Sequence, residues 1–514
     1  MRRTGSYCQL FGVVFLLLLA ACNPLPRESD QTDEPLEITP DYTSVVIPPN
    51  IAPMNFQVRN EGRNFVAEIS SSRERGIRIA DRDGTIEIPL RSWKKMLQED
   101  RGGFLTITVY RKTDENRWER FKEIRNEISP DEIDSYVAFR KIPPANILWN
   151  EMGIYQRCIE NFRETPIMVN NLTDRNCMNC HSFHAGNPEQ MVFHMRGAFG
   201  GTLVTNGKEI NFVETKSDHT RSSGVYPSWH PDGDLIAFSA NLIRQGFHAR
   251  IGDIDYVYDR YSDILLYDVK NNCVTRPAEL ASDDLENTPA WSADGRKLYY
   301  ICTEKKSDTL PYYTVQYHLM SIDFDRETRK FGHVDTLISA DKFGKSVSFP
   351  RESPKQGLIS FIAVDYGYFS IYNKEADVYF FNTGTGQITR PGINSEFTES
   401  YPSWSTSGSW LMFVSKRGDG ILSQIWFSHV NENGNAGKPF VLPQKDPGFY
   451  DVYLYNYNRP EFISGKVDLN PRKVFSYAKK GADPSAFDME ASISLATGAT
   501  VPAKEETDEF YHHD

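Results

Sequence analysis

Tyr226-Pro227-Ser228-Trp229-His230-Pro231-Asp232-Gly233 has three further copies in the second half of the chain. They occupy positions 288–295 (TPAWSADG), 349–356 (FPRESPKQ) and 401–408 (YPSWSTSG). In all four copies a proline stands six positions before the last residue, and apolar residues follow that residue at the third and fifth positions. This alternation predicts a tight turn followed by a strand that enters a core. The copies therefore predict a repeated β unit.

Each copy continues into a second strand pattern. A unit of short strands cannot bury both faces alone, so neighbouring units must stack, and radial closure is the usual solution. The P-x-W-S-x-D-G pattern resembles the blade motif of the TolB-like β-propeller family over at least residues 226–444, although the third copy has Glu352 in place of Trp and Gln356 in place of Gly. Strand patterns in 190–215 and 451–480 suggest further blades. We predict a propeller of about six blades over 190–480.

The region before the propeller has a different character. Residues 43–140 contain strand-like runs and one short helical pattern at 92–99, which predict a mainly β, sandwich-like domain. Residues 141–189 are expected to form a connector, and 481–514 an acidic flexible tail. The net charge of −12 over 514 residues argues against a nucleic-acid partner.

The N-terminus predicts export. Arg2 and Arg3 precede an apolar run that ends in Leu19-Ala20-Ala21-Cys22, which resembles the lipobox of bacterial lipoproteins. The resemblance implies a signal peptide at 1–21, acylation of Cys22 and a tether over 22–42. Asn23, rather than Asp, at the second mature position favours the outer membrane. An ordinary signal peptide with a chance cysteine is the alternative.

Cys177-Met178-Asn179-Cys180-His181 has the spacing of a c-type haem attachment motif. Both thiols can add to the haem vinyl groups, and the adjacent histidine can coordinate iron. With 7 Cys and 11 His in the chain, about 0.002 such motifs are expected by chance. A thioredoxin-like redox pair or a zinc site are the alternatives, but a βαβ context and a second C-x-x-C pair are both lacking. We predict one covalent haem c held by Cys177, Cys180 and His181.

The second axial ligand is open at this point. The strand pattern at 190–196 places Met191, Phe193 and Met195 on one face and His194 on the other. Met195 is the first candidate for the distal position and His194 the alternative, followed by Met191, His184 or an open site. A Met and Phe stripe is also an ordinary core pattern.

Taken together, these features resemble uncharacterised TolB-like lipoproteins of Bacteroidetes that carry a haem motif, a resemblance that brings no known substrate. The absence of G-x-S-x-G, H-E-x-x-H and Walker patterns favours a non-enzymatic protein. Electron transfer at the cell envelope is the first functional hypothesis, with a membrane contact through the lipid anchor and an unknown redox or envelope protein as partner. The alternative is a binding or scaffold lipoprotein for envelope proteins or glycans, with a structural or sensory haem. An oxidoreductase with a pocket at the propeller mouth is a third option.

Overall fold

The computed structural model describes residues 26, 28–73, 76–144, 151–246, 256–305, 311–355 and 357–493. The predicted signal peptide, the predicted lipidation site Cys22 and residues 494–514 of the predicted tail lie outside the described residues. The chain forms two compact units, the first made of Met1–Ile47, Ala52–Pro130 and Pro443–Asp451, and the second of the remaining residues. Within the described ranges, no helix is long and apolar enough to cross a membrane.

The first unit contains two sheets and a helix. Its three-stranded sheet joins β2 (Ile38–Thr39), β4 (Phe56–Val58) and β7 (Thr85–Ile86). Helix α1 (Leu90–Glu99) buries Trp93, Met96 and Leu97, whose spacing of three and four residues places them on one face. The short helix α3 (Phe449–Val452) begins in this unit. The seven-stranded sheet contains β1 (Asp30–Gln31), β3 (Val46–Ile47), β5 (Arg63–Ser71), β6 (Ile77–Asp81), β8 (Phe104–Lys112), β9 (Trp118–Arg120) and β10 (Ile124–Ile128).

The second unit contains six sheets, each built on four antiparallel strands that we call blades 1 to 6. Blade 1 has β14 (Met178–Phe183), β15 (Met191–Met195), β16 (Gly201–Asn206) and β17 (Glu209–Glu214); blade 2 has β18 (Val225–Trp229), β19 (Leu235–Gly246), β20 (Tyr256–Asp268) and β21 (Cys273–Thr275); blade 3 has β22 (Leu285–Trp291), β23 (Lys297–Thr303), β24 (His318–Asp325) and β25 (Lys330–Ile338). Blade 4 has β26 (Ser346–Glu352), β27 (Leu358–Val364), β28 (Asp377–Asn382) and β29 (Ile388–Thr389), and blade 5 has β30 (Glu399–Trp404), β31 (Trp410–Ser415), β32 (Gln424–His429) and β33 (Phe440–Val441).

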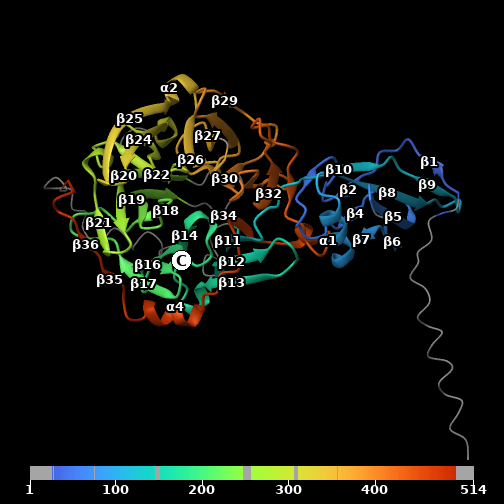
Figure 1. The fold of residues 1–514 in the computed structure, drawn as a ribbon, viewed down its shortest axis with the longest axis horizontal. Coiled ribbons are helices and arrows are strands. Elements are labelled where there is room, and N and C mark those ends of the chain that lie inside the picture. The colour runs from blue at the N-terminus through green and yellow to red at the C-terminus, as the bar shows by residue number, and fades with distance from the viewer. Residues whose placement is uncertain are drawn as a thin grey trace, which may run out of the picture. The chain divides into compact units, whose positions relative to one another are not determined.

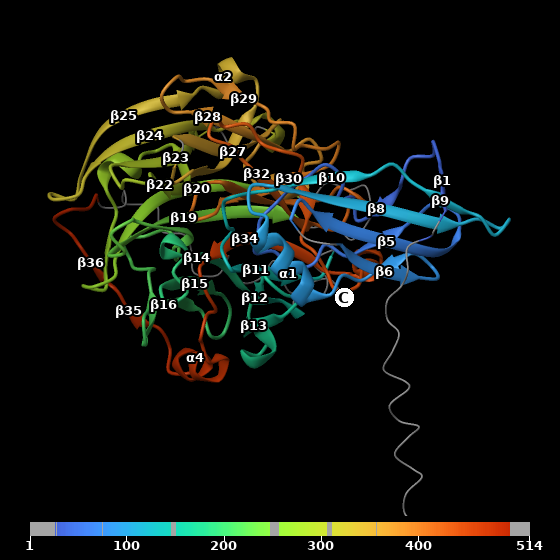
Figure 2. The ribbon, with the colours of Figure 1, turned by 45° about the vertical axis from the view of Figure 1, so that its right-hand side comes forward.

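Blade 6 closes the ring with strands from two distant parts of the chain. Strand β34 (Asn456–Ile463) pairs with β11 (Tyr136–Ile142), which continues to β12 (Gly153–Cys158) and β13 (Glu164–Val169), as Figure 2 shows. The innermost strands β14, β18, β22, β26, β30 and β34 each contact the next, and β34 contacts β14 (Figure 1). The second unit is therefore a closed six-bladed β-propeller. The prediction of a mainly β chain with a propeller of about six blades is confirmed.

The structure differs from the predicted segment boundaries. Residues 141–189, expected as a connector, contribute β12, β13 and β14 to two blades, and the propeller starts at β11 rather than at 190. The physical reason is ring closure: the hydrogen bonds of β34 with β11 tie both ends of the propeller segment together. The described part of the predicted tail also forms strands, since β35 (Asp483–Pro484) and β36 (Ala486–Phe487) extend blades 1 and 2. Within the predicted tether, β1 and β2 are strands of the first unit.

Two helices accompany the blades. Helix α2 (Ala340–Phe343) precedes blade 4, and α4 (Pro471–Ala478) contacts β13 and β17. Helix α4 is capped by Asn470, whose side chain accepts hydrogen bonds from the amides of Arg472 and Lys473. Its buried Val474 and Ala478 join the core between blades 6 and 1. The helix thus covers the outer end of that core (Figure 2).

Candidate functional site

The predicted haem motif lies on the innermost strand of blade 1. One residue of every innermost strand has a positive φ of 45–54°, and the pairing with the next strand shifts there. These residues are Cys180, Tyr226, Thr288, Phe349, Tyr401 and Arg459. Five of them are followed by proline, whereas Cys180 is followed by His181. The motif therefore occupies the place of the repeated blade motif, and His181 stands where the other blades have proline.

The side chains of five of these residues, all except Thr288, meet at the propeller axis. The Arg459 guanidinium carbon lies 5.3 Å from the ring centre of Tyr226 and 5.9 Å from those of Phe349 and Tyr401. The Phe349 and Tyr401 rings are 4.8 Å apart. Burial, and then nearby Cys180 and Tyr401, raise the pKa of Tyr226. Because Tyr226 and Tyr401 belong to blades 2 and 5, Cys180 can lie near both only at the axis.

His181 is fully buried next to this axis. Neither ring nitrogen has a hydrogen-bond partner among the described residues. Burial lowers the pKa of His181 to about 3, and Arg459 and Arg140 act in the same direction. The backbone of Ala138 and of Arg459 lies near the ring and opposes this shift, but neither forms a hydrogen bond of acceptable geometry. Burying two ring nitrogens without hydrogen bonds costs folding free energy. A purely structural role does not explain why a histidine stands at this position.

The two thiols of the motif face different surroundings. Cys177 is partly buried and packs against the core between blades 6 and 1, whereas Cys180 is 2% exposed and lies at the axis. Neither is in a disulfide bond. Next to Cys177, the Asn176 side chain also buries an amide nitrogen, Nδ2, without a partner.

The predicted distal ligands lie on opposite faces of blade 1. We call one the methionine face, which carries Met178, Met191, Phe193, Met195, Leu203 and Phe212 and packs against blade 6. The other is the valine face, which carries Val192, Val204 and Val213 and packs against blade 2. Met195 and Met191 belong to the methionine face, where Met195 is paired with Met178.

The histidine candidates are engaged elsewhere. His194 Nδ1 lies 3.0 Å from Thr202 Oγ1, and burial followed by Arg196 lowers the pKa of His194 to about 3. His184 uses both ring nitrogens, Nδ1 at 2.6 Å from Gln190 Oε1 and Nε2 at 2.8 Å from the Pro231 carbonyl oxygen. Of the candidates named from the sequence, the structure therefore brings Met195 and Met191 to the face that His181 shares with Phe183.

The core at the methionine face is unusually rich in methionine. Five of the eleven methionines of the chain are in it, namely Met152, Met168, Met178, Met191 and Met195. Methionine is unbranched and adapts to irregular spaces better than branched side chains. The packing around the motif can therefore rearrange more easily than an ordinary core.

Sequence reasoning missed the cations around the motif. Arg140 and Arg459 are 8% and 6% exposed, and both influence His181. Burial and then Arg459 lower the pKa of Arg351 to about 10. The signal was present, since Arg459-Pro460-Glu461-Phe462 and Cys180-His181-Ser182-Phe183 have the spacing of Tyr226-Pro227-Ser228-Trp229.

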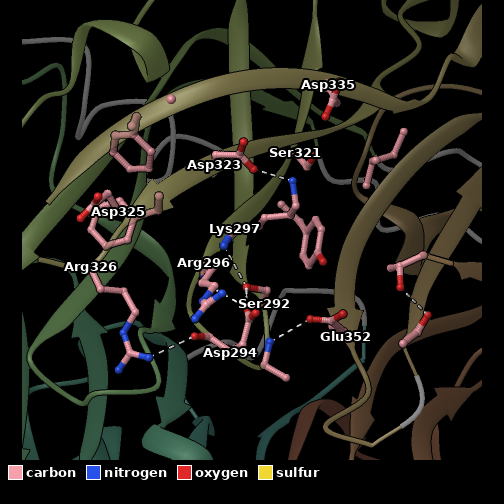
Figure 3. Close-up of a pocket in the computed structure, with 18 of the residues that line it drawn as sticks. Ser292, Asp294, Arg296, Lys297, Ser321, Asp323, Asp325, Arg326, Asp335 and Glu352 are labelled. Carbon is pink, nitrogen blue, oxygen red and sulfur yellow. Dashed lines mark hydrogen bonds and ion pairs between the residues drawn. The ribbon is translucent and has the colours of Figure 1, made fainter. Parts of the chain in front are cut away.

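A large polar hollow lies elsewhere, between blades 3 and 4 (Figure 3). It measures about 1520 Å³, and many of its charges are already paired. Lys297 Nζ lies 2.5 Å from Asp323, and Glu352 accepts a hydrogen bond of 2.8 Å from the Ala293 amide. Nearby, His230, Asp232 and Asp234 form a group that could hold a cation, but both carboxylates are bound by arginines. The thiols of the motif do not line this hollow.

No family model matches the chain, and no curated protein matches it. Among solved structures, TolB from Acinetobacter baumannii is similar with 12% identity and a TM-score of 0.41, covering 70% of this chain and 79% of that one. The β-propeller domain of the trilobed protease from Pyrococcus furiosus has 12% identity and a TM-score of 0.32, with 69% and 96% covered. A chain of the nidogen/laminin complex has 5% identity and a TM-score of 0.37, with 64% and 100% covered. These comparisons assign no function.

Proposed function

We propose that this chain is a lipid-anchored c-type haem protein that transfers electrons at the bacterial cell envelope. The observation that carries the proposal is His181. In five blades the proline at this position has no polar side-chain atom to satisfy. The blade with the C-x-x-C pair has instead a histidine with two buried ring nitrogens that have no partner among the described residues. An iron ligand gives such a nitrogen a partner.

The residues present fit a haem in their chemistry. Cys177 and Cys180 are free thiols that can form thioether bonds, and His181 is a neutral imidazole that can coordinate iron. A bound haem would supply a one-electron redox centre. The side chains around the motif are closely packed, so haem binding would require the methionine face to open. Methionine side chains rearrange at lower cost than branched ones.

The remaining residues of the site have roles of their own. The methionine face excludes water from His181, and a dry, apolar surrounding is one of the protein's means of setting a haem potential. Backbone carbonyl groups near the ring, at Ala138 and Arg459, are of the kind that orient a ligating histidine through its second nitrogen.

The proposal is tested by the covalent bond. After export in a host that attaches haem c, the full chain should keep its haem through acid–acetone extraction and denaturing electrophoresis. The double variant Cys177→Ala/Cys180→Ala should contain none. Cys302→Ala, which removes a free cysteine outside the motif, is the control and should retain haem. A pigment that extracts into acetone, or protein with zinc and no Soret band, would contradict the proposal.

A second candidate function, the binding of an envelope protein or glycan, is favoured by a cluster of tyrosines. Tyr256 and Tyr258 at the start of β20 stack on Tyr312 with ring centres 4.9 and 5.7 Å apart, and Tyr366 lies 5.8 Å from Tyr312. Neighbouring Tyr313 is 58% exposed. Exposed tyrosines supply large, amphipathic contact area and are enriched at binding surfaces.

A redox titration separates the two candidates. A reversible midpoint potential and rapid oxidation by a partner would support electron transfer. A haem that does not change its redox state would favour the binding role.

Membrane attachment is part of the proposal and has its own test. Cys22→Ser should move the protein from the membrane to the soluble fraction, because acyl chains are what make such an anchor stable. Persistence in the outer-membrane fraction would indicate attachment through a protein partner instead.

A further inference from the structure

Next to the proposed haem motif, buried arginines outnumber the carboxylates that face them. Arg140 is on β11 and Arg459 on β34, in two paired strands of blade 6. Arg140 Nε and Arg459 Nη1 are buried and make no hydrogen bond with any described residue. Together with His181, they concentrate unsatisfied polar atoms on one side of the axis. Native cores contain few such atoms, and a cluster of them indicates a missing group.

The sign of the missing charge follows from the neighbours. Arg140, Arg351 and Arg459 bring three positive charges to this part of blades 4 and 6. Glu461 is the carboxylate that faces Arg351 and Arg459, and its Oε2 also accepts a hydrogen bond of 2.9 Å from the Phe183 amide. Asp259 is a second buried carboxylate near the axis, where it and Arg459 both act on Tyr226. Two carboxylates do not balance three guanidiniums, and buried charges are stable only when paired.

Aromatic packing accounts for only part of this arrangement. The rings of Tyr226, Phe349 and Tyr401 attract the Arg459 guanidinium, but a ring offers no acceptor for an N–H at the edge of the guanidinium plane. Arg140 has no cation–π contact among the described residues, so its buried Nε is explained even less by packing.

We propose that Arg140 and Arg459 form a binding site for carboxylate groups, and that in the haem-bearing protein the haem propionates occupy it. The assignment of the propionates as the ligand rests on the proposed function, whereas the affinity of the two arginines for a carboxylate does not. Arginine presents N–H pairs that match a carboxylate, and the two carboxylates of a haem would add negative charge that Glu461 and Asp259 do not supply. The arginines then act as positioning residues that orient the haem relative to His181.

The first experiment needs no haem. The full-length chain with Cys177→Ser and Cys180→Ser is melted in sodium acetate and in sodium chloride at equal ionic strength. Acetate should raise the melting temperature in a saturable way, because a ligand that binds only the folded state stabilises it. Adding Arg459→Gln or Arg140→Gln should remove the acetate effect. Arg390→Gln, which removes a charge from a surface ion pair with Asp377, should retain it.

The second experiment uses the haem-bearing chain and distinguishes haem carboxylates from free anions. If the propionates fill the site, acetate should no longer raise the melting temperature. Arg140→Gln should lower the midpoint potential with both thioether bonds intact, because loss of a nearby positive charge favours ferric iron. Arg140→Lys should restore part of that shift, and Arg390→Gln should cause none.

The outcomes keep this inference apart from the proposed function. Absence of covalent haem in the wild-type chain would overturn the proposed function, while the acetate effect on the thiol-free chain would still support a carboxylate site. An acetate effect that persists in the haem-bearing chain would overturn the assignment to the propionates. No acetate effect in the thiol-free chain, together with an unchanged potential in Arg140→Gln, would overturn the site itself.

Discussion

The two faces of blade 1 differ in their side chains although they belong to the same four strands. The valine face packs Val192, Val204 and Val213 against a core that includes Trp229 of blade 2. The methionine face packs long, unbranched and aromatic side chains against blade 6 and α4. One sheet therefore has a stiff side and an adaptable side.

This difference indicates which side of blade 1 can rearrange more easily. Branched valines have few side-chain conformations, and a core built on them cannot change shape cheaply. Methionines reorganise at low cost. Cys177 and the ring of His181, which has no partner among the described residues, lie on the adaptable side. Arg140 and Arg459 face it from blade 6, which is assembled from two distant segments.

Two truncations should show the difference directly. Phe183 occupies in blade 1 the place that Trp229 has in blade 2, and their exposed fractions are 6% and 7%. Large aromatic truncations in cores cost about 3–5 kcal/mol, depending on how far the site can collapse. In the haem-free chain we expect Trp229→Ala to be at the upper end and Phe183→Ala at the lower end, measured by urea unfolding. Equal losses would contradict the idea of an adaptable face.

A pH titration extends the comparison to blade 2, which buries the carboxyl group of Asp259. It accepts hydrogen bonds from Asn287 at 2.7 Å, Tyr317 at 3.0 Å and Tyr368 at 3.2 Å, and burial nevertheless raises its pKa to about 6. The folded state then holds a proton that the unfolded state has already lost. The contribution of Asp259 to stability is therefore fully present below about pH 4 and is lost as the pH rises through 6.

The size of that fall follows from the pKa difference between the two states. A shift of about two units corresponds to about 3 kcal/mol. Burial raises the pKa of Glu286 to about 7, so Glu286 contributes to the pH dependence with the same sign. The contribution of Asp259 alone is the difference in pH dependence between the wild type and Asp259→Asn. Urea unfolding at pH 4 and pH 7 measures it. An equal change in unfolding free energy between pH 4 and pH 7 for the two proteins would contradict the prediction.

A single substitution at position 181 can give blade 1 the proline that blade 2 has at position 227. In the haem-free chain, His181→Pro replaces two unsatisfied ring nitrogens with the residue that the other five blades have, so we expect about 1–3 kcal/mol of added stability in urea unfolding. The reverse exchange, Pro227→His in blade 2, is the control and should lose a similar amount. If His181→Pro destabilises the haem-free chain, the histidine has a structural role that its surroundings do not reveal.

The sequence predicted the regular blades far better than the two that form the site. In blades 2 to 5 the proline stands at the same distance before the turn in every copy, which a local pattern can reveal. In blade 1 Cys180-His181 replaces the residues that carry the repeat. In blade 6 Tyr136 pairs with Ile463, and no local signal predicts a pairing over that separation.

The cations of the site were hidden for a related reason. An arginine in a strand pattern is ordinarily expected on the exposed face. From the sequence, Arg140 and Arg459 would therefore have been placed at the surface. Only the closed ring shows that both are buried beside His181. The motif residues could be proposed from the sequence because the C-x-x-C-H pattern is local.

The smallest change in stability should accompany the largest change in spectrum, and it concerns the distal side of the iron. Met195→Leu nearly conserves volume, so it should cost less than about 1.5 kcal/mol. If Met195 is the distal ligand, the haem should stay attached while the iron moves toward high spin and the potential falls, because a thioether favours ferrous iron.

His194→Gln is the control on the valine face. His194 is engaged with Thr202, so this variant should leave the spectrum unchanged. Since the two residues point to opposite sides of β15, only one of them can meet an iron bound on the methionine face. High-spin iron in His194→Gln alone would move the ligand, and with it the haem, to the valine face. An unchanged spectrum in both variants would leave Met191 or an open position, which Met191→Leu then decides.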